Sequence, residues 1–145
     1  MSSPRPGSLT SRLQRATATV LVVEDEPDIA TFLGAFFRAS GLEVVHIDPM
    51  TPGEVVVAMR EHRPACLLLD LRLQGFTGLD VLVQLRAELS LPEVPVVVFS
   101  GDGRPERREE ADAFGVAAFV TKPFSVKELY GLVSDLVGTG APAAR

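Results

Sequence analysis

Five short, mostly apolar segments alternate along this chain with segments whose apolar residues recur at helical spacing. The apolar segments are Thr19–Val23, Glu43–Ile47, Ala65–Asp70, Val94–Ser100 and Ala117–Thr121. Runs without regular polar alternation are typical of parallel strands that are buried on both faces. The helical segments between them supply the crossovers that parallel strands require. The pattern therefore predicts an α/β fold, with a doubly wound, five-stranded parallel sheet covered by helices on both sides.

The helical segments carry recognisable start signals. Thr51–Glu54 and Ser125–Glu128 have the spacing of capping boxes, and Thr77 can cap a further helix with Asp80 at its third position. The first helix, with Pro27 in its first turn, has an apolar stripe that we expect to face the core: Ile29, Phe32, Leu33, Phe36 and Phe37. In the third helix the residues expected to face inward are Leu82, Leu85 and Leu89.

The fourth helical segment, Arg104–Phe114, differs from the others in its composition. Its apolar anchors are limited to Ala111, Ala113 and Phe114, and charged residues fill most of the remaining positions. A helix with so narrow an apolar face gains little from burial. We therefore expect this helix to be weakly attached and able to shift.

Length and charge limit the range of possible functions. The 145 residues suit one domain, which we place at residues 19–137, between a flexible leader (1–18) and a flexible tail (138–145). The formal charge is −5, and the leader contributes only arginines to it, so the domain itself is more acidic still. Such a charge argues against nucleic acid or a membrane surface as the main partner. No apolar run approaches the ~18 residues of a membrane span, and Cys66 has no second cysteine to pair with, so we expect a cytoplasmic protein.

Polar residues gather where the predicted strands end. Glu24–Glu26 follow the first strand, Asp70 and Ser100 end the third and fourth, and Lys122 follows the fifth. The carboxyl ends of parallel strands share one edge of a sheet, so we expect these side chains to converge there. Clustered carboxylates repel one another unless a cation binds, and an all-oxygen site with few protein ligands suits Mg²⁺.

The same edge points to phosphoryl chemistry without a nucleotide. An ammonium and a hydroxyl can both donate hydrogen bonds to a phosphoryl group. Neither glycine-rich phosphate motif, GxxxxGK[ST] or GxGxxG, occurs in the chain. The remaining possibility is a carboxylate that itself attacks phosphorus, as in proteins that form an aspartyl phosphate.

Four stretches in sequence order resemble the receiver domain of response regulators, the phosphoacceptor component of bacterial two-component signalling. They are VLVVEDEPDI, LLLDLRLQGFTGLDVL, VVVFSGDG and AAFVTKPFS, and with their intervening segments they cover about residues 19–137. The resemblance implies the flavodoxin-like fold of CheY, with strand order 2-1-3-4-5.

The resemblance implies a role for each residue of the acidic edge. Asp70 would be the phosphoacceptor, and Lys122 would hold the phosphoryl group, with a cis bond to the following proline. Asp25, Asp70 and the backbone carbonyl of Arg72 would ligate Mg²⁺, or Mn²⁺ in its place, and Glu24 would act through water.

Four further positions match the switch and tuning residues of the family. Ser100 would be the switch hydroxyl and Phe119 the switch aromatic. Arg72 and Asp102 occupy the positions that tune hydrolysis of the phosphoryl group, and their opposite charges lead us to expect an ion pair across the mouth of the site.

The resemblance implies a phosphoacceptor that is not an enzyme beyond Mg²⁺-dependent self-phosphorylation and autodephosphorylation. Its expected partners are a sensor histidine kinase and a downstream protein that binds the face made by the fourth helix, fifth strand and fifth helix. We expect a monomer or weak dimer. Two alternatives remain open: a phosphorelay intermediate that serves a histidine phosphotransfer protein, and a receiver fragment of a larger regulator.

Each residue also has an ordinary explanation when it is taken alone. Acids favour the N-terminus of a helix, Asp70 could belong to a turn, and Phe119 could be core. We interpret His46 and His62 as unpaired and distant from the acids, without a ligand role. The joint pattern, not any single residue, carries the functional interpretation.

Overall fold

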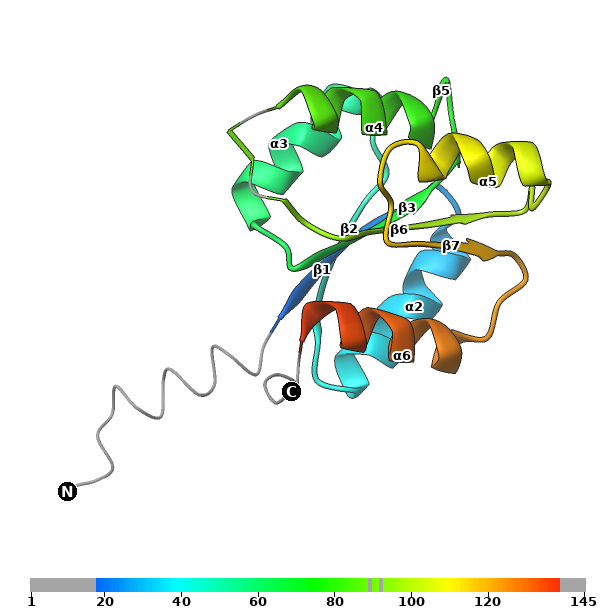
Figure 1. Cartoon of the computed structure of the whole chain (residues 1–145). Coiled ribbons are helices and arrows are strands. Elements are labelled where there is room, and N and C mark those ends of the chain that lie inside the picture. Colours follow the sequence, from blue (N-terminus) through cyan, green and yellow to red (C-terminus); the bar gives the residue numbers. More distant parts are fainter. Residues whose placement is uncertain (1–17, 89, 92, 139–145) are drawn as a thin grey trace.

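Five parallel strands form the centre of the protein, as Figure 1 shows for this computed structural model, which describes residues 18–88, 90–91 and 93–138. The strands are β1 (Thr19–Val23), β2 (Glu43–Ile47), β3 (Cys66–Asp70), β6 (Val96–Ser100) and β7 (Ala118–Thr121). Their order is β2-β1-β3-β6-β7, and every neighbouring pair is parallel. The predicted doubly wound sheet and its 2-1-3-4-5 order are thereby confirmed.

Helices cover both faces of the sheet. On one face lie α2 (Pro27–Ala39) and α6 (Val126–Val137); on the other lie α3 (Pro52–His62), α4 (Gly78–Ala87) and α5 (Pro105–Asp112). The predicted caps form: Thr51 and Ser125 each accept a hydrogen bond from the backbone N–H three residues on. Thr77 and Asp80 bond reciprocally as a complete capping box.

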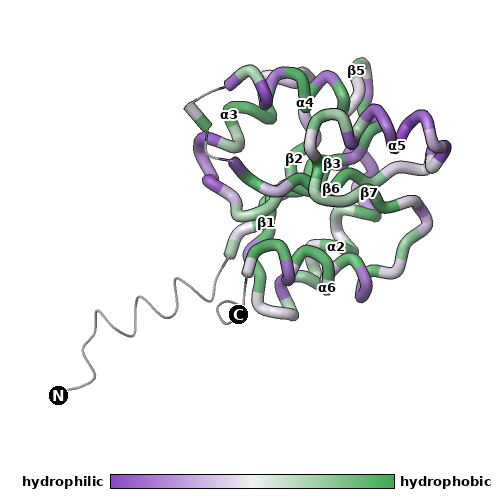
Figure 2. The backbone as a smooth tube through the Cα atoms, viewed as in Figure 1, coloured by the Kyte–Doolittle hydropathy of each residue, from purple (hydrophilic) through white to green (hydrophobic). Residues whose placement is uncertain are grey.

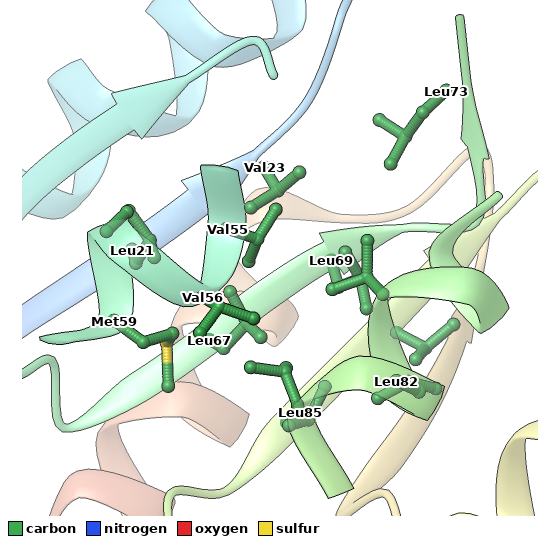
Figure 3. Close-up of a cluster of buried hydrophobic side chains, with 14 of the residues drawn as sticks. Leu21, Val23, Val55, Val56, Met59, Leu67, Leu69, Leu73, Leu82 and Leu85 are labelled. Carbon is green, nitrogen blue, oxygen red and sulfur yellow. The ribbon is translucent and has the colours of Figure 1, made fainter. Parts of the chain in front are cut away.

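Two apolar clusters, one on each face, hold the helices to the sheet. Alternate residues of one strand enter opposite clusters: in β3, Leu67 and Leu69 face α3 and α4, whereas Leu68 faces α2 and α6. Figure 3 shows the first cluster, in which Leu82 and Leu85 of α4 pack over β3. Burial on both faces leaves polar chemistry to the edges of the sheet, where the strands end.

A short hairpin follows Asp70 that the sequence did not predict. Strands β4 (Arg72–Leu73) and β5 (Phe76–Thr77) pair in antiparallel register, with Arg72 opposite Thr77. Gly75, at a φ of 87°, adopts the left-handed conformation that the tight connection requires. The hairpin ties the segment after Asp70 to the start of α4.

One predicted core residue lies outside the core. Phe32 is 57% exposed, because the buried face of α2 consists of Ala30, Leu33, Gly34 and Phe37. Phe32 lies on the opposite side of the helix from this face, so the apolar stripe is wider than the surface that it buries. In α4, Leu82 and Leu85 are buried as expected, whereas Leu89 lies outside the described residues.

Helix α5 has little apolar contact with the rest of the protein. Its buried residue is Ala111, and Figure 2 shows the helix as predominantly hydrophilic. Phe114, just beyond its end, packs against the α3–α4 cluster, whereas Ala113 is exposed. The predicted leader and tail lie almost entirely outside the described residues, and within the described part no helix has the length and apolarity to cross a membrane.

Gly78, the first residue of α4, allows the helix to approach β3 closely. A Cβ at this position would lie 2.7 Å from the carbonyl oxygen of Asp70 and 3.0 Å from Cα of Leu71. We expect Gly78→Ala to lower the free energy of unfolding by about 1–3 kcal/mol in urea denaturation, because backbone must move to relieve the overlap.

Gly131 provides the matched control for this substitution. It is exposed on α6, and a Cβ there would meet nothing within 4 Å. Gly131→Ala should raise the free energy of unfolding by roughly 0.5–1 kcal/mol, because alanine favours the helix. Equal effects from the two substitutions would contradict the close approach at Gly78.

Candidate functional site

Three carboxylates meet at the carboxyl edge of the sheet. Glu24 and Asp25 follow β1 and Asp70 ends β3; each has an oxygen within 4.8 Å of the others. Glu24 and Asp70 are buried, and Asp25 is half-buried. Strand pairing makes this proximity unavoidable, because β1 and β3 are neighbours whose register aligns Val23 with Leu69.

Lys122 is held against these acids. Its Nζ lies 3.1 Å from Oδ2 of Asp70, 3.5 Å from Oε1 of Glu24 and 3.4 Å from Oε1 of Glu26. The bond from Lys122 to Pro123 is cis, as expected. Burial by itself lowers the pKa of Lys122, but the charges of Asp70 and Glu24 outweigh it, so the pKa is raised. The lysine is therefore a fixed positive charge at the site.

Glu24 is the least satisfied group of the site. Its Oε2 accepts a hydrogen bond from the N–H of Glu26 at 3.0 Å, whereas its fully buried Oε1 has no hydrogen-bond partner among the described residues. Burial, reinforced by the charge of Asp70, raises the pKa of Glu24 to about 8. A buried carboxylate oxygen without a donor, beside two other acids, fits a small divalent cation that prefers oxygen ligands. The residues present therefore suit Mg²⁺.

Ser100 lies at the end of β6, facing the same edge. Its Oγ accepts a hydrogen bond from the backbone N–H of Asp102 at 3.0 Å. The carboxylate of Asp102 is in turn held by Arg104, at 2.9 and 2.8 Å, and by Arg107 at 3.2 Å. These hydrogen bonds, chiefly those from Arg104, hold the pKa of Asp102 well below its usual range. The hydroxyl of Ser100 is thus connected, through Asp102, to the N-terminus of α5.

The expected ion pair between Arg72 and Asp102 is wrong. Asp102 binds Arg104 and Arg107, and no described ion pair joins it to Arg72. Arg104 and Arg107 lie two and five residues along the chain, so they reach Asp102 at a smaller cost in entropy than a residue across the site. The backbone N–H of Arg72 instead donates to Oδ1 of Asp70 at 3.0 Å; ligation of a metal by its carbonyl stays a prediction.

Phe119 is half-buried on β7 beneath α5. The guanidinium of Arg108 lies 4.8 Å from the centroid of its ring, and Nη2 of Arg108 donates to Oγ1 of Thr121 at 3.3 Å. A cation over an aromatic face is attracted by the ring quadrupole. Sequence analysis did not identify Arg108 as a partner of Phe119, because the contact depends on how α5 crosses β7.

The acids and basic groups line one open cavity of about 710 Å³. Its lining comprises Asp25, Glu26, Asp70, Arg72, Gly101, Asp102, Arg104 and Lys122. The structure thus brings Asp70 and Lys122 together with Arg72 and Asp102 at a solvent-accessible edge.

His46 lies closer to the acids than the sequence indicated. Its Nε2 is 2.7 Å from the carbonyl oxygen of Glu24, so the interpretation of this histidine as distant from the acids is wrong. Register explains the proximity, because His46 pairs with Val22 on the neighbouring strand, two residues before Glu24. Composition offered no signal for this contact, since a lone histidine in a strand has no characteristic pattern.

Comparison with protein families assigns the domain. The sequence model of the response regulator receiver domain matches residues 20–134. The chain belongs to this family. The match begins one residue into β1, includes the other strands in full and ends within α6, so the acidic edge lies within it.

Similar proteins include transcriptional regulators that are longer than this chain. The chain is 36% identical over 114 residues to a probable transcriptional regulatory protein, TcrX, of Mycobacterium tuberculosis, covering 77% of this chain and 46% of that protein. It is 30% identical over 125 residues to the phosphate regulon transcriptional regulatory protein PhoB of Escherichia coli, covering 86% and 54%. The chain therefore spans about half the length of these relatives.

Solved structures give the same fold. The chemotaxis protein CheY4 of Vibrio cholerae has a TM-score of 0.74 at 21% identity, covering 83% of this chain and 99% of that one. The receiver domain of the Francisella response regulator 1452 has a TM-score of 0.74 at 25% identity, covering 83% and 96%. Similarity at this level of identity establishes the arrangement of the sheet and its helices.

Glu24→Gln tests whether repulsion among the clustered carboxylates destabilises the folded protein when Glu24 is charged. Without added metal, a raised pKa means that the stabilising contribution of neutral Glu24 is full below the ordinary carboxyl pKa and is lost as pH rises through about 8. We expect wild type to lose stability over this window, and Glu24→Gln to be more stable at pH 9 by about 1–2 kcal/mol. Urea denaturation at several pH values in the presence of a chelator measures both.

Mg²⁺ should reverse part of the loss of stability that wild type shows at high pH relative to Glu24→Gln. It should stabilise wild type at pH 9, because it binds the folded state, and stabilise Glu24→Gln less. Glu61→Gln, at an exposed position of α3, should behave as wild type. Parallel pH profiles for Glu24→Gln and wild type would contradict a destabilising repulsion at Glu24.

Proposed function

We propose that this receiver domain accepts a phosphoryl group on Asp70 from the phosphohistidine of a sensor histidine kinase. The observation that carries the proposal is the contact of Asp70 with Lys122, 3.1 Å apart beside Glu24 and Asp25 at the open edge of the sheet. A carboxylate that is buried on one side, paired with an ammonium and exposed to a cavity can act as a nucleophile. The acids supply the ligands that Mg²⁺ prefers.

Asp70, Lys122 and Ser100 have different roles in the proposed transfer. A carboxylate oxygen of Asp70 forms a bond to phosphorus as the bond from phosphorus to the histidine nitrogen breaks, and the imidazole leaves with the electron pair. Lys122 stabilises the charge on the phosphoryl oxygens, and Ser100 can donate its hydroxyl to them. Mg²⁺, held by Asp25, Asp70 and the Arg72 carbonyl with Glu24 acting through water, would shield charge between acids and phosphoryl group.

Phosphorylation would change the contacts of α5. The adduct adds negative charge and acceptor oxygens beside Ser100, and the Ser100 Oγ that now accepts from Asp102 would turn toward them. This movement pulls on the loop that Arg104 and Arg107 hold. Phe119 and Arg108 couple the loop to the α5–β7–α6 face, which we infer to be the surface for a downstream protein.

We further propose that the domain acts in the cytoplasm as a phosphoacceptor, and that self-phosphorylation and autodephosphorylation are its only reactions. A second candidate is supported by the comparisons: because the chain spans about half the length of regulators named as transcriptional, the same receiver could serve as the input part of a longer protein. A phosphorelay role would use the same Asp70 chemistry with a histidine phosphotransfer protein as acceptor.

Asp70→Asn tests the phosphoacceptor directly. Incubation of wild type with acetyl phosphate and Mg²⁺ should add one phosphoryl mass, detected by intact-protein mass spectrometry, and Asp70→Asn should lose the adduct. The control, Asp135→Asn, removes an exposed acid on α6 and should label as wild type. An adduct that persists in Asp70→Asn would contradict the assignment.

Asp102 provides a test of the connection between Ser100 and α5. If the Arg104 and Arg107 clamp resists movement of Ser100, Asp102→Ala should increase affinity for a beryllium-fluoride phosphoryl analogue by about two- to threefold. Loss of the negative charge of Asp102 would by itself also increase affinity for the anionic analogue. The double variant Arg104→Ala/Arg107→Ala separates the two, since it removes positive charge but also frees the loop. Weaker analogue binding by the double variant would contradict the clamp.

A further inference from the structure

The backbone ladder between β1 and β2 has a missing donor beside the acidic site. The N–H of Glu43 bonds to the carbonyl of Ala18, and the N–H of Glu24 bonds to the carbonyl of Ile47 at 3.3 Å. In a parallel ladder, a residue that donates to one partner residue accepts from the N–H two residues further on. The carbonyl of Glu24 should therefore accept from residue 49.

Residue 49 is a proline, which has no N–H to donate. Pro49 is buried, so its place beside the end of β1 is fixed by packing and not left to solvent. The ladder consequently stops one bond early. It stops at the backbone carbonyl of Glu24, the first acid of the site. If this carbonyl had no hydrogen-bond donor, the turn that follows it would be loosely held.

The ring of His46 takes the place of this donor. Its Nε2 lies 2.7 Å from the carbonyl oxygen of Glu24, a normal length for an N–H···O hydrogen bond. A carbonyl can only accept, so Nε2 must carry the proton. His46 shares the face of β2 on which Val44 packs, and strand pairing sets it opposite Val22. The register therefore directs its ring along the edge toward Glu24.

We propose that His46 is a positioning residue for the metal and phosphoryl site, acting through the backbone of Glu24. The bond from Glu24 N–H to Ile47 and the bond from His46 to the Glu24 carbonyl hold this residue from both sides. Its side chain is held by the N–H of Glu26. Together these contacts fix the turn that carries Glu24, Asp25 and Glu26, and hence the spacing of the acids around Asp70.

The proposal predicts a specific genetic rescue. His46→Ala removes the substitute donor and should weaken Mg²⁺ binding by about three- to tenfold, the effect of one hydrogen bond. Pro49→Ala restores the missing backbone N–H, so His46→Ala/Pro49→Ala should regain most of the affinity of Pro49→Ala alone. His46→Gln keeps an amide donor at a similar reach and should bind Mg²⁺ nearly as wild type does.

Calorimetric titration with Mg²⁺ alone measures these affinities, and two further readouts need no metal. Amide hydrogen exchange at Asp25 and Glu26 should accelerate in His46→Ala and slow again in the double variant. Long-range ¹H–¹⁵N NMR spectra of wild type should show the His46 proton on Nε2. His62→Ala removes the other histidine, which is exposed on α3, and should change none of these measurements.

The outcomes are distinct from those of the proposed function, on which the phosphoryl part of this inference rests. Equal Mg²⁺ affinity and exchange in His46→Ala and His62→Ala would overturn the positioning role. A loss in His46→Ala that neither Pro49→Ala nor His46→Gln reverses would overturn the donor substitution. If Asp70 of wild type forms no adduct, the proposed function fails, while the exchange comparison still decides the role of His46.

Discussion

Repulsion among three clustered carboxylates at the carboxyl edge of the sheet is the main electrostatic constraint in this structure. Glu24, Asp25 and Asp70 have oxygens within 4.8 Å of one another, and two of the three side chains are buried. Among the described residues, Lys122 is the cation that contacts Asp70 and Glu24. One ammonium cannot neutralise three carboxylates, and within the described part of the chain one oxygen of Glu24 has no hydrogen-bond partner. A divalent cation would relieve this repulsion, so the proposed Mg²⁺ site and the proposed phosphoacceptor lie at the same edge of the sheet.

The ends of the strands explain why functional side chains lie where they do. Where a parallel ladder stops, backbone groups lose their regular partners and other groups must supply hydrogen bonds. The His46 ring serves the carbonyl of Glu24, and Oγ of Ser100 serves the N–H of Asp102. Oδ1 of Asp70 likewise accepts from the N–H of Arg72. The contacts that complete the backbone thus also orient the side chains that face the cavity.

Sequence patterns predicted the features that depend on one segment at a time. Strand alternation, helix caps and the placement of Glu24, Asp25, Asp70 and Lys122 at strand ends all follow from local periodicity and from the shared edge of a parallel sheet. Contacts between segments that are distant in the sequence were harder to predict from these patterns. The partners of Asp102 depend on how the loop enters α5, and the contact of His46 depends on the register of β2 against β1. Neither geometry is encoded in a periodicity, although the proline at position 49 was visible in the sequence as a residue without a donor.

The attachment of α5 shows how a change of charge at Asp70 can be transmitted. Apolar packing holds α4 through Val81, Leu82 and Leu85, and such packing changes little when a nearby charge changes. Helix α5 buries Ala111, and its other described contacts are polar: Arg104 and Arg107 bind Asp102, whose backbone N–H bonds to Oγ of Ser100, and Arg108 lies over Phe119 of β7. Ion pairs respond directly to a new charge within a few ångströms. The helix whose loop contacts Ser100 is therefore also the helix whose attachment is electrostatic, and a phosphoryl group on Asp70 would act first on its position.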